Sequence, residues 1–173
     1  MDVPLPIACI RRLSQDPVFV AAVRSTYDAL DQRIAARSPV CTNRGECCLF
    51  SSFGHTLFVT SVELAYFLAN TDEPLSAPAH GGSCPYQVEG RCTTRRARPA
   101  GCRIFFCDPR ATEWQPVATE SVLRRLQAIG ERFHLAYAYI EWTDALRQLG
   151  GAVRPPTGTG AEPGAIDSPL GAS

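Results

Sequence analysis

The chain has 173 residues, 45% of them hydrophobic, which is enough for one domain with an ordinary core. Its 17 basic residues balance its 17 acidic residues, and this argues against nucleic acid as a partner. Apolar runs are too short for a membrane-spanning helix, and the first residues do not resemble a secretory signal. We therefore expect a cytoplasmic protein with no membrane partner, whose cysteines serve metal or redox chemistry because thiols stay reduced there.

The first predicted element is an amphipathic helix over 17–37. Asp16 is suited to cap it, and Pro17 fits the first helical position, where a backbone N–H is not needed. The helix should end before Pro39, because the residue preceding proline avoids helical geometry. The apolar positions that recur at helical spacing are Phe19, Val23, Leu30 and Ile34.

A short strand over 56–59 and a second helix over 61–69 are predicted next. Thr60 followed by Glu63 forms the sequence pattern of a capping box, in which each residue pairs with the other's backbone N–H. The segment 71–83 is rich in proline, glycine, alanine and serine, which is typical of a loop.

The segment 84–107 shows no sustained periodicity, only cysteines, arginines and turn residues. Helical spacing of apolar residues returns over 119–149 and predicts two helices, with a break near Gly130 or within 134–138. The remainder, 150–173, is rich in glycine and proline and is predicted to be a disordered tail.

Cysteine is the informative residue type in this sequence. No pair has the two-residue gap of zinc fingers and ribbons. Seven thiols in irregular segments nevertheless suit zinc or iron, with an iron–sulfur cluster as one form of the latter, better than magnesium or calcium. Metal binding can supply roughly 10–16 kcal/mol, enough to order such loops. The predicted metal ligands are Cys41, Cys47, Cys48, Cys84, Cys92, Cys102 and Cys107.

The number of metal ions stays open at this point. One tetrahedral zinc takes four ligands, so seven cysteines allow two metals, a polynuclear cluster, or one site with spare redox-active thiols. His55 and His80 lie in nearby loops, where they could serve as fourth ligands, but each is interpreted as an ordinary loop histidine. Cys9 lies outside the cluster and is interpreted as a packed or incidental thiol.

Arginines are dense in the same region, with five between positions 91 and 103. A guanidinium group favours a neighbouring thiolate and offsets the negative charge of a thiolate site. We predict that Arg98 and Arg103 support the bound cofactor in this way. A solvated basic loop is the alternative interpretation.

Four short motifs together resemble the YkgJ family of cysteine-cluster proteins, which are mostly uncharacterised and bacterial. They are Cys41-Thr-Asn-Arg-Gly-Glu-Cys47-Cys48, Thr60-Ser-Val-Glu63, Cys84-Pro-Tyr with Gly90-Arg-Cys92, and Arg98-Pro-Ala-Gly-Cys102-Arg-Ile-Phe-Phe-Cys107. The later segment Tyr137-Ala-Tyr-Ile-Glu-Trp142 is also similar. This resemblance implies a zinc- or iron-chelating domain. The family pattern has a further cysteine where this chain has Arg44. A remote similarity extends to a flagellin lysine N-methylase that shares the cysteine pattern.

These observations predict a mainly α fold, in which one small domain over 1–149 has amphipathic helices packed beside an irregular cysteine-rich region, with at most a short strand pair. The motif core is 41–107, and metal is the predicted partner. We expect a metal-binding protein, with no catalytic residue or protein partner indicated. The alternatives are a redox or protein-modifying enzyme that uses the cluster, or a zinc-stabilised interaction module.

Overall fold

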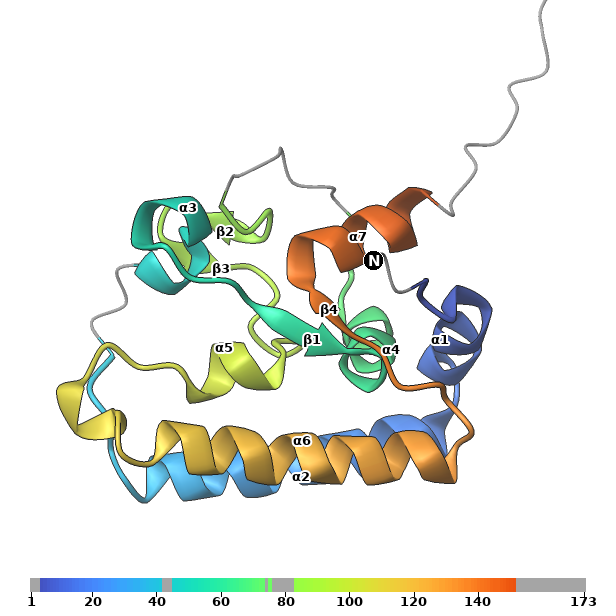
Figure 1. The fold of residues 1–173 in the computed structure, drawn as a ribbon, viewed down its shortest axis with the longest axis horizontal. Coiled ribbons are helices and arrows are strands. Elements are labelled where there is room, and N and C mark those ends of the chain that lie inside the picture. The colour runs from blue at the N-terminus through green and yellow to red at the C-terminus, as the bar shows by residue number, and fades with distance from the viewer. Residues whose placement is uncertain (1–3, 42–44, 74, 76–82, 152–173) are drawn as a thin grey trace, which may run out of the picture.

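A computed structural model describes residues 4–41, 45–73, 75 and 83–151, and it confirms the mainly α class. Two long helices form one side of the domain, shorter helices pack on them, and the cysteine-rich loops lie on the opposite side (Figure 1). Within the described ranges no helix is long and apolar enough to cross a membrane. The side chains with the largest fully buried volumes include Phe19, Phe67, Leu126 and Trp142.

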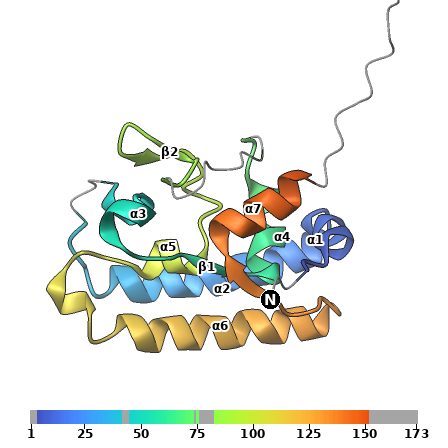
Figure 2. The same ribbon diagram turned by 45° about the horizontal axis from the view of Figure 1, so that its top comes forward.

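The long helices are α2 (Pro17–Ala35) and α6 (Gln115–Arg132), which run antiparallel and contact each other along their length. The predicted cap is confirmed, since the Asp16 carboxylate accepts hydrogen bonds from the amides of Val18 and Phe19. Both views show this pair as a floor beneath the rest of the domain (Figure 2). The opposite side of the core is covered by shorter helices and by the loops.

Helix α4 (Ser61–Asn70) is the central element of the core, and α1 (Ile7–Ser14) packs against it. The predicted capping box is confirmed: the Glu63 amide donates to the Thr60 hydroxyl, and the Thr60 amide donates to the Glu63 carboxylate at 2.7 Å. Sequence patterning missed α1 because eight residues give only about two turns of periodicity.

Two short antiparallel strand pairs are present. Strand β1 (Phe58–Thr60) pairs with β4 (Tyr139–Glu141), with Val59 opposite Ile140. Strand β2 (Gln87–Val88) pairs with β3 (Arg91–Cys92) in a tight hairpin. The β1–β4 pair joins segments about 80 residues apart and fixes the start of α7 (Trp142–Gly151) against the core.

The predicted break between the C-terminal helices falls after α6, in the 134–138 region, and not at Gly130, which lies inside α6. Strand β4 was not predicted, because three residues are too few to show alternation. The predicted loop over 71–83 is described only in part. Most of the predicted tail lies outside the described residues, but Gly150 and Gly151 belong to α7.

Candidate metal centre

The site begins with a short helical turn, η1 (Glu46–Cys48), which presents two adjacent cysteines. A backbone hydrogen bond ties this turn to a distant segment, because the Cys84 amide donates to the Cys48 carbonyl at 2.7 Å. In a helical turn neighbouring side chains diverge less than on an extended strand, where they point to opposite faces. The adjacent thiols can therefore face one neighbourhood, which an extended backbone would prevent.

The thiol of Cys48 lies between those of Cys47 and Cys84, and its side chain is hydrogen-bonded to both. This contact lowers the pKa of Cys47 to about 6 and the pKa of Cys84 to about 7. The same two contacts raise the pKa of Cys48, since donation of its S–H favours its neutral form. Three thiols from two segments thus form a chain of polarised sulfur atoms.

The β2–β3 hairpin carries Cys92, which is close enough to Cys102 to raise the pKa of that thiol. Glu89 and Gly90 form its two-residue turn, both with positive φ (49° and 77°), as a tight hairpin requires. Gly45, with φ of +71°, packs against this turn: a Cβ on it would lie 2.8 Å from the Gly90 carbonyl oxygen and 2.9 Å from the Gln87 side-chain nitrogen. A glycine at position 45 is what allows the hairpin to approach η1.

Gly45→Ala is therefore expected to destabilise the protein by about 2 kcal/mol, because alanine meets both the positive φ and the contact with the hairpin. Chemical denaturation followed by circular dichroism measures this loss. The control is Gly54→Ala, since Gly54 has a similar φ of 63° but a Cβ added there would have no atom within 4 Å. Equal losses in both variants would contradict the role given to close packing at Gly45.

Cys102 enters from helix α5 (Ala100–Ile104), two residues after the helix start. Burial raises the pKa of Cys102, and the nearby Cys84, Cys47 and Cys92 raise it further. Its position depends on the core, because the Ala100 amide donates to the Glu63 carboxylate at 2.8 Å. We call Cys47, Cys48, Cys84, Cys92 and Cys102 the five-thiol group.

The two arginines predicted to support a cofactor have different surroundings. Arg98 is close enough to favour the thiolate forms of Cys47 and Cys102. It adds to the stronger hydrogen bond from Cys48 in lowering the pKa of Cys47, and it opposes the larger rise that burial causes in the pKa of Cys102. Arg103 is buried, and its guanidinium donates to Asp31 at 2.6 Å and to the carbonyls of Arg96 and Arg98.

The Arg103 guanidinium also lies 4.3 Å from the centre of the Tyr27 ring, and this cation–π interaction stabilises the position of the Arg103 side chain. It therefore holds the loop that carries Arg98. A direct contact of Arg103 with a cofactor stays a prediction.

An aromatic group backs the site. Phe67, Tyr86 and Trp142 pack against one another, with ring centres 5.0 to 6.1 Å apart. The buried Trp142 Nε1 has no hydrogen-bond partner of ordinary geometry in the described structure, yet its N–H lies near enough to Cys84 to lower the pKa of that thiol. An N–H directed at a thiolate is a common support for metal-bound sulfur. Sequence reasoning assigned Trp142 no part in the site.

The remaining candidate ligands come from other segments of the chain. Cys41 and Cys107 are exposed, and they lie on adjoining segments because the Val40 amide donates to the Asp108 carboxylate at 3.0 Å. His55 donates from Nε2 to the Cys47 carbonyl at 3.1 Å and stacks on Phe105. His80 and Arg44 lie outside the described residues.

The eight cysteines are all described, and none forms a disulfide. Among the described residues, no three histidine, cysteine, aspartate or glutamate side chains already have the arrangement of a formed metal site. Cys47, Cys48, Cys84 and Cys102 nevertheless lie close together, with Cys92 in electrostatic range of Cys102. Soft sulfur donors are the ligands that zinc and iron–sulfur clusters take. The donor chemistry therefore fits such a group.

Together, the fold and the site define a small mainly α domain with a clustered-thiol region supported by buried aromatic and arginine side chains. Comparisons with protein-family models, curated proteins and solved structures found no match.

Proposed function

We propose that this chain is a metal-binding protein that holds zinc or iron, the latter as an iron–sulfur cluster, through the five-thiol group. The observation that carries the proposal is the hydrogen-bonded contact of Cys48 with both Cys47 and Cys84, with Cys102 in electrostatic range. Four sulfur atoms from η1, the Cys84 segment and α5 thereby gather beside the aromatic group.

Charge favours this assignment. Several thiolates in one place repel each other, and a divalent cation or a cluster removes that repulsion. Arg98 offsets part of the remaining negative charge. A bound metal would draw the sulfur atoms inward and order the loops around them. We place the protein in the reducing cytoplasm as part of this proposal, because thiols stay unoxidised there. The resemblance to the YkgJ family agrees with the proposed metal binding.

Cys41 and Cys107 stay predicted ligands from the sequence. Their segments adjoin each other through the hydrogen bond between Val40 and Asp108.

The test is elemental analysis of the full chain, purified under reducing and oxygen-free conditions, combined with its visible spectrum. We expect stoichiometric zinc in a colourless protein or iron with sulfide in a brown one. Removal of the metal with a chelator should make the segment 83–107 sensitive to protease, because its order depends on the ligand. Absence of both metals, with all thiols still reduced, would contradict the proposal.

A further inference from the structure

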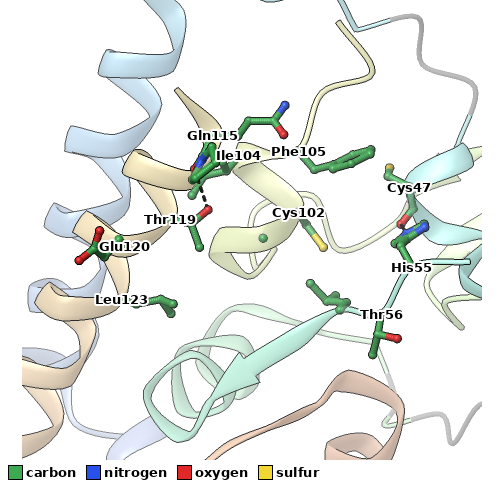
Figure 3. Close-up of a pocket in the computed structure, with 13 residues that line it drawn as sticks. Cys47, His55, Thr56, Cys102, Ile104, Phe105, Gln115, Thr119, Glu120 and Leu123 are labelled. Carbon is green, nitrogen blue, oxygen red and sulfur yellow. Dashed lines mark hydrogen bonds between the residues drawn. The ribbon is translucent and has the colours of Figure 1, made fainter. Parts of the chain in front are cut away.

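A cavity of about 600 Å³ lies beside the five-thiol group, between α5, the first half of α6 and the chain before β1. Cys47 and Cys102 both line it, and Figure 3 shows the Cys102 side chain on α5 extending toward the segment where Cys47 lies next to His55. A cavity of this size is typical of sites for small molecules. The thiols of the proposed centre are therefore open to a ligand from this side.

The cavity walls are predominantly apolar. Leu57 comes from the chain before β1, Leu123 comes from α6, and Ile104 and Phe105 come from the end of α5. Phe105 is half exposed and stacks on His55 with their ring centres 5.8 Å apart. These walls offer burial to hydrocarbon or aromatic surface, for which the gain is about 25 cal/mol per Å².

Three polar side chains that α6 contributes to the walls are already paired. The Thr119 hydroxyl donates to the Gln115 carbonyl at 2.9 Å, and the Gln115 amide donates to the Phe106 carbonyl at 3.0 Å. Glu120 pairs with Arg124 at 3.1 Å. A charged ligand would lose its hydration here and gain no unpaired charge from these wall residues.

We propose that this cavity binds a neutral, largely apolar small molecule, with one end of the molecule against the sulfur atoms of Cys47 and Cys102. This inference rests on the proposed function, because the metal centre forms that end of the site. It adds that an apolar small molecule can reach the proposed metal, which would then do more than stabilise the fold.

The test uses the metal-loaded full-length protein and two fluorescent probes of the same ring system, neutral N-phenyl-1-naphthylamine and its anionic relative 1-anilinonaphthalene-8-sulfonate. The neutral probe should bind at least about tenfold more tightly, since burial of the sulfonate costs hydration. In cobalt-substituted protein the neutral probe should also shift the visible absorption bands, because it lies against two candidate ligands.

Variants locate the binding. Leu123→Trp and Thr119→Phe fill the cavity from α6 and should weaken the neutral probe at least about tenfold each. Val117→Trp is the matched control, because Val117 is on the same helix, is 63% exposed and does not line the cavity. Thermal unfolding and metal content show that each variant is folded and loaded, and two filling variants guard against the failure of one.

The inference is overturned if loaded protein fails to bind the neutral probe, if the filling variants bind it like Val117→Trp, or if the cobalt spectrum does not respond. The inference is also overturned if the protein prefers the anionic probe. It is equally overturned if the cavity is occupied only by an apolar side chain of another protein. Failure of the proposed function would give a different result, because the protein would then take up no zinc, iron or cobalt.

Discussion

The Cys102→Ser variant is expected to lose most of its bound metal and to unfold at a lower temperature. Serine is a poor ligand for soft metals, and Cys102 supplies the thiol of α5 to a group whose other members come from η1, the Cys84 segment and the hairpin. If metal binding contributes on the order of 10 kcal/mol to folding, loss of one ligand removes a large share of it. Elemental analysis and calorimetry on the same preparation measure both effects.

Cys9→Ser is the matched control for this substitution. Cys9 lies on α1, outside the five-thiol group, and its sulfur accepts a long contact of 3.4 Å from Arg12. Its metal content should equal that of the unmodified chain. If Cys102→Ser also kept its full metal content, the assignment of the five-thiol group as the centre would be wrong.

The Glu63→Ala variant should lower the free energy of unfolding by about 3 kcal/mol, because removing a buried acceptor leaves its donors unsatisfied. The carboxylate accepts from the Thr60 amide and hydroxyl, the Ala100 amide and the Tyr27 hydroxyl. Burial raises the pKa of Glu63, and these donors oppose that rise by favouring the ionised form. Denaturant titration gives the loss directly.

Glu63→Ala should also weaken metal binding at the proposed centre. The Ala100 amide is fixed by Glu63, and Cys102 follows two residues later on the same short helix, so metal affinity should fall although position 63 holds no ligand. Glu131→Ala is the control, since it removes an exposed carboxylate of α6 and should change stability by less than about 0.5 kcal/mol. Unchanged metal affinity in a destabilised Glu63→Ala protein would refute this coupling.

Local signals in the sequence were sufficient for several elements. Asp16 and Pro17 begin α2 as predicted, because capping depends on residues within one turn. Thr60 and Glu63 likewise start α4. Strand β4 escaped prediction, since it pairs with β1 across about 80 residues and is too short to be recognised without its partner.

The candidate site likewise has features that the sequence predicts and features that only the tertiary structure shows. The sequence alone determined that thiols are concentrated between Cys41 and Cys107 and that amphipathic helices flank them, because composition and periodicity are local properties. Only the tertiary structure decided which thiols meet. The amide of Cys84 binds the carbonyl of Cys48, the hairpin packs on Gly45, and Glu63 fixes α5, and each of these is a contact between distant segments that spacing along the chain does not encode.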